Sequence, residues 1–250
     1  MDSKIYSVSA REILDSRGNP TLEVIAVLNS GYRGMASVPA GASIGKYEAM
    51  ELRDNDPKRY GGRGVLKAVD NVNRVINPKL KGTDALNQSA VDTLVIGLDG
   101  TPNKGKLGAN ALLGVSLSVA AAAANHQRLA LYRYLNMLVN GGRESRMTRI
   151  PTPTFNVING GKHGGGNLDF QEYHIVPVSN KSFREALRMG VELYHAVGEL
   201  LKARGLLHAT GDEGGFAPKL STNMDPLEIL SEAIRTSPYR FGADVFFGLD

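Results

Sequence analysis

The chain has 250 residues, with 29 Lys and Arg against 25 Asp and Glu, and it contains neither cysteine nor tryptophan. The absence of cysteine excludes disulfides and thiolate metal sites, and it favours a reducing compartment such as the cytoplasm. The net charge of +4 is small and the basic residues are scattered, so we expect no nucleic-acid partner. The longest uncharged apolar stretch, residues 111–124, is too short to cross a bilayer, and we expect no membrane span.

Residues 1–140 predict an α+β domain. Alternating apolar and polar residues predict three strands that form an antiparallel meander, over 4–8, 21–29 and 32–38. Apolar residues at helical spacing predict four helices, over 64–76, 88–96, 108–127 and 132–139. We expect Pro78 to end the first helix, and we place a domain boundary at the glycine- and charge-rich linker 140–146.

Residues 149–250 predict a second domain with the order strand, strand, helix, helix, strand. The strands are expected over 153–158, 170–176 and 245–249. The last is a continuous apolar run, which is typical of a strand buried on both faces in a parallel sheet. The long helix over 183–203 is amphipathic. Its predicted inward face consists of Ala186, Leu187, Val191, Tyr194, Val197 and Leu201.

The segment 211–218 holds two adjacent carboxylates, Asp212 and Glu213, between glycines. Glycine allows unusual backbone angles and close approach of a ligand, so carboxyl groups placed there are presented to a binding partner. A plain polar turn is the alternative interpretation. His163 lies between two glycine clusters, in a loop with room for a ligand. The other four histidines, His174 among them, have no such setting, and we expect structural roles for them.

Three further patterns have more ordinary interpretations. The segment 100–107 is close to a phosphate-binding loop, but Leu107 replaces the required Ser or Thr, which favours a connecting loop. Ser43 lies in a Gly-x-Ser-x-Gly pattern that matches a hydrolase nucleophile. It follows Pro39 and a half-exposed strand, so a flexible loop is favoured, and a ligand role for Ser43 stays open. Asp250 is a single carboxylate at the end of a predicted strand, and one carboxylate alone does not make a magnesium site.

Taken in order, seven motifs give the whole chain a clear resemblance to enolases (phosphopyruvate hydratases). The motifs are Asp15-Ser-Arg-Gly-Asn-Pro-Thr21, Gly41-Ala-Ser-x-Gly-x-x-Glu48-Ala49, Lys106-Leu-Gly-Ala-Asn-Ala111, Asn159-Gly-Gly-x-His163, Gln171-Glu172, Gly211-Asp-Glu-Gly-Gly-Phe-Ala-Pro218 and Gly248-Leu-Asp250. The resemblance implies an N-terminal α+β domain, followed by the start (ββαα-β) of an enolase-type TIM barrel that is incomplete in this chain.

The resemblance also implies a lyase reaction, the reversible dehydration of 2-phosphoglycerate to phosphoenolpyruvate in glycolysis, with Mg²⁺ as cofactor. The scheme of a base acting with one or two magnesium ions is a known pattern of this superfamily. By motif, the matching residues are Glu213 as the acid for the leaving hydroxyl, Glu172 as a second catalytic carboxylate that also contacts substrate, His163 and Gln171 as substrate-binding residues, and Asp250 and Ser43 as magnesium ligands.

Three residues depart from the family's usual pattern, namely Ile44, Gly164 and His174, which stands where an apolar residue is common. The family's lysine base, phosphate-binding arginine and two further metal carboxylates would lie beyond Asp250. We therefore expect the chain alone to be inactive. Four interpretations of the chain stay open. It is an enolase segment whose barrel is completed by a second chain, a truncated enolase sequence, a non-catalytic enolase-derived module, or a hydrolase with Ser43 as its nucleophile. The resemblance further implies a homo-oligomer, with its contact near Arg11, Arg17 and Glu23.

Overall fold

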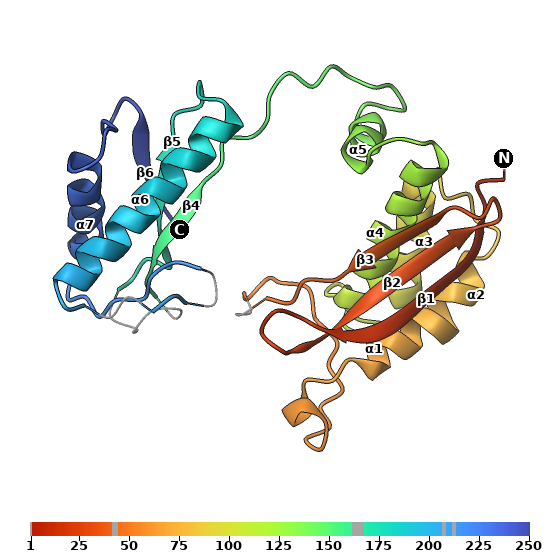
Figure 1. Ribbon diagram of the computed structural model, residues 1–250. Coiled ribbons are helices and arrows are strands. Elements are labelled where there is room, and N and C mark those ends of the chain that lie inside the picture. The colour runs from red at the N-terminus through yellow and green to blue at the C-terminus, as the bar shows by residue number, and fades with distance from the viewer. Residues whose placement is uncertain (1, 42–44, 162–167, 207–208, 212–213) are drawn as a thin grey trace. The chain divides into compact units, whose positions relative to one another are not determined.

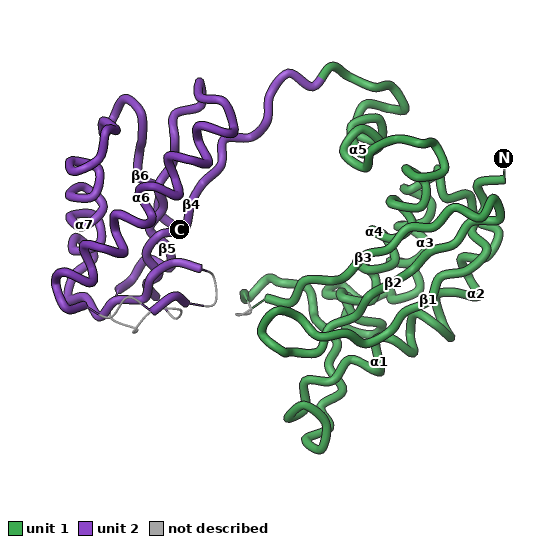
Figure 2. Tube along the Cα trace, viewed as in Figure 1, with its two compact units in different colours: residues 1–146 green, residues 147–250 purple. Residues whose placement is uncertain are grey.

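The structure, a computed structural model, describes residues 2–41, 45–161, 168–206, 209–211 and 214–250. The chain forms two compact units, residues 1–146 and 147–250 (Figure 2). Each unit has its own hydrophobic core. The two units are described separately below.

Unit 1 is built on a three-stranded antiparallel sheet in the order β1-β2-β3 (Figure 1). The strands are β1 (Ile5–Leu14), β2 (Pro20–Leu28) and β3 (Arg33–Ser37). The predicted meander is confirmed, but β1 is longer than predicted because it pairs with β2 from Ile5 as far as Leu14, opposite Pro20.

Helices cover one face of this sheet, most of them in contact with the strands and two of them packed on another helix. They are α1 (Leu66–Asp70), the π-helical turn η2 (Asn71–Ile76), α2 (Asn77–Leu80), α3 (Gln88–Asp99), α4 (Ala109–His126) and α5 (Leu131–Val139), with a short 3-10 turn η1 (Tyr60–Gly62) before them. The apolar α4 lies against β2 and β3, and Gly34 of β3 allows the close approach. A Cβ at residue 34 would stand 2.1 Å from the backbone nitrogen of Ala122.

Pro78 does not end the first helix, as the sequence had predicted, because it lies within the first two residues of α2. Helical backbone continues from η2 into α2, since Ile76 and Asn77 both have right-handed helical angles, so Pro78 lies inside a continuous helical run. The π-helical turn before it places two side-chain amides against the outer edge of β1. Asn73 bonds both the N–H and the carbonyl of Ala10, at 2.8 and 3.1 Å, and Asn77 accepts from Val8 N–H at 2.9 Å. These contacts cover backbone groups that an edge strand otherwise leaves open.

The loop after α3 is organised around the buried carboxylate of Asp99, which confirms a connecting loop at residues 100–107. Asp99 accepts hydrogen bonds from the N–H of Leu107 at 2.6 Å, from the N–H of Thr101 at 2.9 Å, and from the Thr101 hydroxyl. Burial raises the pKa of Asp99, but these hydrogen bonds outweigh burial and hold the pKa below its ordinary value of 3.8.

Unit 2 contains a second three-stranded sheet, in the order β4-β5-β6, covered on one face by two helices (Figure 1). The elements are β4 (Phe155–Asn159), β5 (Glu172–Pro177), α6 (Phe183–Ala203), α7 (Met224–Arg235) and β6 (Val245–Leu249). Tyr173 and Ile175 of β5 share the buried core with Leu193 and Val197 of α6 and with Ile229 of α7. This order is the predicted opening of a barrel; the described residues form an open sheet rather than a closed barrel.

Two predictions for unit 2 were wrong. Strand β6 pairs with β5 in the antiparallel direction and is not buried on both faces, since Phe246 is 41% exposed. On α6, Leu187 and Val191 are exposed rather than inward. The buried stripe runs instead through Met189, Gly190 and Leu193. Gly190 lets the helix lie directly on the Phe155 ring of β4, since a Cβ at residue 190 would stand 2.4 Å from that ring.

Across the described part of the chain, no helix is long and apolar enough to cross a membrane.

The Asp99 site predicts an acid-dependent contribution to stability. In Asp99→Asn, an amide N–H group would face backbone donors, so we expect the free energy of unfolding to fall by about 1–3 kcal/mol at neutral pH. Because the folded-state pKa of Asp99 is lowered, its contribution is full above the unfolded-state pKa. It is lost as the pH falls through the folded-state pKa.

Urea unfolding over a series of pH values measures both effects. The control is Asp70→Asn, which removes an exposed pair with Arg74 and is expected to change stability by less than about 1 kcal/mol. An Asp99→Asn protein as stable as the wild type at neutral pH would contradict the assignment.

Candidate active site

Polar side chains form a row across the three strands of unit 2. Strand β5 pairs Glu172 with Asn159 of β4. On its other side, Glu172 exchanges two backbone hydrogen bonds with Asp250: the Asp250 N–H donates to the Glu172 carbonyl at 3.1 Å, and the Glu172 N–H donates to the Asp250 carbonyl at 3.3 Å. Residues directly opposite each other in antiparallel strands lie on the same face of the sheet. Asn159, Glu172 and Asp250 therefore form one row, which we call the site row.

The site row lies where one end of each of the three strands meets, and we call this end the edge of the sheet. Strand β4 ends at Asn159, β5 begins at Glu172, and Asp250 directly follows β6. The N–H of Gln171 also donates to the Asp250 carbonyl, at 2.8 Å, which holds this edge together. Opposite residues have Cβ atoms about 4.5–5.5 Å apart, so the side chains of Glu172 and Asp250 begin as neighbours on one face.

A second row lies one step further into the sheet on the same face. His174 of β5 is opposite Asn156 of β4 and Gly248 of β6. On β4 this step spans three residues, from Asn159 to Asn156, because the register shifts between Asn156 and Ile158. The Nε2 atom of His174 is in hydrogen-bond contact with a carboxylate oxygen of Glu172, and both side chains are largely buried, with 18% and 17% of their surfaces exposed. The sequence had predicted only a structural role for His174. In the structure it lies against a residue of the site row.

Backbone hydrogen bonds join the chain on the two sides of residues 212–213 next to β4, and we call the described residues 209–211 and 214–216 the hairpin. The Gly211 N–H donates to the Gly215 carbonyl at 2.8 Å, and the Gly214 N–H donates to the Gly211 carbonyl at 3.0 Å. Phe216 then bonds the end of β4: its N–H donates to the Val157 carbonyl, and the Asn159 N–H donates to the Phe216 carbonyl, both at 2.8 Å. The residues that flank the Asp212-Glu213 pair are thus fixed next to the site row.

Helix α6 also contacts this hairpin, through Tyr194. The Tyr194 hydroxyl donates to the Gly214 carbonyl at 2.9 Å, and its ring stacks on Phe216 with 4.4 Å between ring centroids. Burial raises the pKa of the Tyr194 hydroxyl, so this group remains protonated and able to donate at neutral pH. The contact fixes the carbonyl of the residue that directly follows Glu213 in the sequence.

Two buried amides lie under the hairpin. The side-chain oxygen and nitrogen atoms of Asn156 and Asn159 are buried, and within the described residues they have no hydrogen-bond partner. A Cβ at residue 215 would stand 2.2 Å from Asn159 Oδ1 and 2.6 Å from Asn156 Oδ1. Only glycine fits at residue 215 without moving these amides.

The donor chemistry of the site row fits magnesium in kind. Mg²⁺ prefers oxygen ligands in octahedral geometry and usually keeps several waters. Glu172 and Asp250 offer carboxylate oxygens on one face, whereas the Asn159 amide is fully buried beside Gly215. No group of three His, Asp or Glu side chains suited to a metal ion is present among the residues that the structure describes. The described row could therefore supply only part of a magnesium site.

The residues predicted from sequence divide into two sets. Gln171, Glu172 and Asp250 come together at the edge of the sheet as described above. Ser43, His163 and Glu213 lie outside the described residues.

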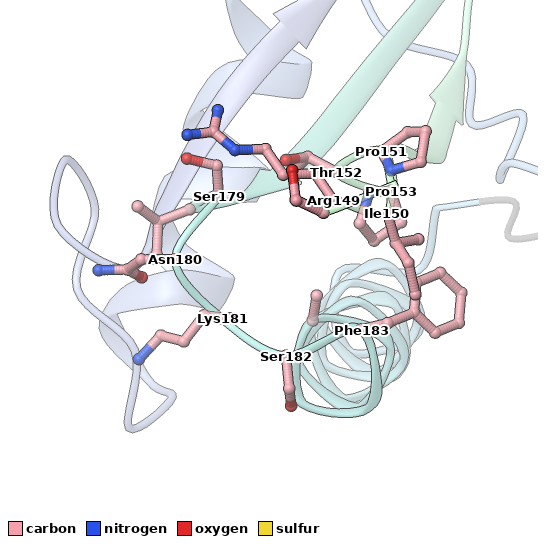
Figure 3. Close-up of a pocket in the computed structure, with 13 residues that line it drawn as sticks. Arg149, Ile150, Pro151, Thr152, Pro153, Ser179, Asn180, Lys181, Ser182 and Phe183 are labelled. Carbon is pink, nitrogen blue, oxygen red and sulfur yellow. The ribbon is translucent and has the colours of Figure 1, made fainter. Parts of the chain in front are cut away.

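A cavity among the described residues of unit 2 lies away from the site row. It has a volume of about 720 Å³, and its lining comes from residues 148–153, which precede β4, and from 178–183, which follow β5 (Figure 3). This is the opposite end of both strands. Of its two basic residues, Lys181 is already paired with Asp244 at 3.3 Å. The cavity shares no residue with the site row, so its size alone does not identify the active site.

An α+β unit followed by a strand-strand-helix-helix-strand unit is the order expected of a protein whose second domain begins an α/β barrel. The family model for the enolase N-terminal domain matches residues 5–135, and that for the enolase C-terminal TIM barrel domain matches residues 147–250. The chain belongs to the enolase family.

The packing of Gly215 against the buried amides gives a direct prediction. In Gly215→Ala, the new methyl group would displace Asn156 and Asn159, so we expect the free energy of unfolding of unit 2 to fall by about 1–3 kcal/mol. Hydrogen exchange should become faster in peptides covering 155–160 and 209–217.

Urea unfolding and hydrogen-exchange mass spectrometry provide the two measurements. The matched control is Gly97→Ala in α3, where a Cβ would meet nothing within 4 Å. That variant should be more stable, by about 0.4–1 kcal/mol. Unchanged stability and exchange in Gly215→Ala would show that the hairpin does not pack as described.

Proposed function

We propose that the chain provides one part of the active site for the reversible dehydration of 2-phosphoglycerate to phosphoenolpyruvate, a carbon–oxygen lyase reaction of glycolysis. The site row of Asn159, Glu172 and Asp250, beside the described residues that flank Glu213 in the sequence, is the observation that supports this most. Membership of the enolase family gives the reaction its class.

The reaction requires a base to remove the proton from C2 and an acid to protonate the departing 3-hydroxyl. We assign the acid role to Glu213, which is flanked by backbone that Tyr194 and β4 hold in place. Glu172 is the second catalytic carboxylate and faces the substrate from the site row. His163 and Gln171 bind the substrate.

For magnesium, we assign Asp250 and Ser43 as ligands contributed by this chain. The ion, when bound, would offset negative charge that builds on the substrate carboxylate. The position of Asp250 opposite Glu172 directs both carboxyl groups toward one side of the sheet. The lysine base, the phosphate-binding arginine and the remaining metal carboxylates have no assigned counterparts among residues 1–250.

A cytoplasmic location and a homo-oligomeric state complete the proposal. The position of Arg11 on the surface of unit 1 is offered in support of the homo-oligomeric state. The Arg11 guanidinium group bonds Glu23 at 2.7 Å, and the Ser37 hydroxyl donates to the same carboxylate at 3.0 Å. Glu23 is buried while the Arg11 side chain is 69% exposed, so a fixed cation is presented on the surface of unit 1.

The reaction is tested by supplying the missing groups. We expect a mixture of this chain with a polypeptide that carries the remaining enolase barrel strands to dehydrate 2-phosphoglycerate. The reaction should stop on chelation of magnesium, and the 250-residue chain alone should be inactive. Glu172→Gln should lower kcat by at least about 100-fold, the lower range for losing a group that acts on a proton in the transition state.

The assay follows the formation of phosphoenolpyruvate by its ultraviolet absorbance. Glu199→Gln, a change on the exposed side of α6, is the control and should retain wild-type kcat. A mixture that is folded and associated, yet inactive with magnesium present, would contradict the proposed reaction.

A further inference from the structure

The environment of His174 differs from that of an ordinary structural histidine. It is the only described histidine in contact with a residue of the site row, and it contacts that residue through its Nε2 atom. Of the other described histidines, His126 contacts the Ser30 hydroxyl in unit 1, and His195 lies edge-on to the Tyr194 ring. Neither reaches a carboxylate of the candidate site.

The position of His174 is built into the sheet. Residues i and i+2 of a strand point to the same face, so Glu172 and His174 both project from β5 on the side of the site row. Gly248, opposite His174, provides the space for the ring. A Cβ at residue 248 would stand 3.2 Å from His174 Cβ and 3.5 Å from Nδ1. A larger residue at 248 would push the imidazole away from its present position.

The charges around the contact fit a donor role for the imidazole. A carboxylate only accepts hydrogen bonds, whereas a neutral imidazole can donate from one ring nitrogen. The acidic groups on this face are Glu172 on the same strand and Asp250 on β6, and the amide of Asn156 lies opposite on β4. Within the described residues, no Lys or Arg side chain pairs with the Glu172 carboxylate. The His174 imidazole is the one described hydrogen-bond partner of that carboxylate.

We propose that His174 is a positioning residue that donates its Nε2–H to one oxygen of Glu172 and orients the other oxygen toward the substrate. The hydrogen bond fixes the rotamer of Glu172, in the way that outer partners orient ligands in other sites. This inference rests on the proposed role of Glu172, and it adds a residue that the resemblance to enolases does not supply.

The contact itself is tested by NMR, without reference to activity. In the chain labelled with ¹⁵N-histidine, the His174 ring signals are assigned by their loss in His174→Gln. We expect the neutral ring to carry its proton on Nε2, with slow exchange with water. That slowly exchanging proton signal should be lost in Glu172→Ala and retained in the control Glu199→Ala.

A His174 ring without a proton on Nε2, or an Nε2 signal that is the same in Glu172→Ala and wild type, would overturn the proposal. Far-UV circular dichroism and the remaining histidine signals check that Glu172→Ala is folded. If that variant is unfolded, Glu172→Leu, which also lacks an acceptor but fills the space, takes its place.

The effect on the reaction is tested with two variants of matched length in the active mixture described above. His174→Met removes the donor and should lower kcat about tenfold, with a smaller change in KM. His174→Gln keeps an N–H donor at the place of Nε2 and should restore most of that loss. Equal kcat in wild type and His174→Met would overturn the positioning role.

The two parts of the test separate this inference from the proposed function. If the wild-type mixture has no dehydratase activity, the proposed reaction fails, and the NMR result still decides whether His174 donates to Glu172.

Discussion

The site depends on one arrangement, the pairing of β5 with an antiparallel neighbour on each side. Because β4 and β6 both run opposite to β5, the end of β4, the start of β5 and the end of β6 meet at one edge of the sheet. The same pairing fixes which side chains share a face. Asn159, Glu172 and Asp250 face one side, while Tyr173 and Ile175 pack against the helices on the other. A slip of one residue in either register would turn Glu172 away from its neighbours.

The polar face of the sheet depends on close packing around it. Glycine at 190 lets α6 lie on Phe155, and glycine at 215 lets the hairpin lie on two buried amides. The hairpin is in turn bonded to β4 through Phe216 and to α6 through Tyr194. Several weak contacts thus hold the backbone on both sides of the Asp212-Glu213 pair, and rigid support of this kind is what an acid needs to meet its substrate in a fixed geometry.

Much of this fold could be predicted from the spacing of apolar residues. Alternation and short apolar runs identified all six strands, and helical spacing identified the bounds of α6 without error. The mistakes concerned the pairing of a strand and the buried face of a helix, because the spacing of apolar residues does not identify the elements packed beside them. The apolar run of β6 suggested a strand buried on both faces of a parallel sheet, whereas β6 pairs with β5 in the antiparallel direction and leaves Phe246 exposed. On α6, Gly190 lies in the buried stripe, and a search for large apolar residues does not find it.

In the candidate site too, some features could be predicted from the sequence and others required the structure. Gln171, Glu172 and Asp250 were identified by motif, but the row that joins them to Asn159 required the strand register. The contact of His174 with Glu172 was not predicted, although a signal was present. His174 stands two residues after Glu172 in a predicted strand, and this spacing alone places both side chains on one face. Nothing in the sequence spacing, by contrast, indicates that Tyr194 reaches Gly214, because that contact joins a helix to a loop 20 residues away.

The position of Glu172 beside Asp250 is the central claim, and a disulfide tests it most directly because the chain has no cysteine of its own. Opposite residues of a hydrogen-bonded antiparallel pair have Cα atoms about 5.5 Å apart, within the range that a disulfide bridges. We expect the double variant Glu172→Cys with Asp250→Cys to form an intramolecular disulfide on mild oxidation, detected by intact mass after alkylation. The pair Glu172→Cys with Leu249→Cys, whose side chains point to opposite faces, should not. Bridging in the second pair but not the first would contradict the register on which the site row depends.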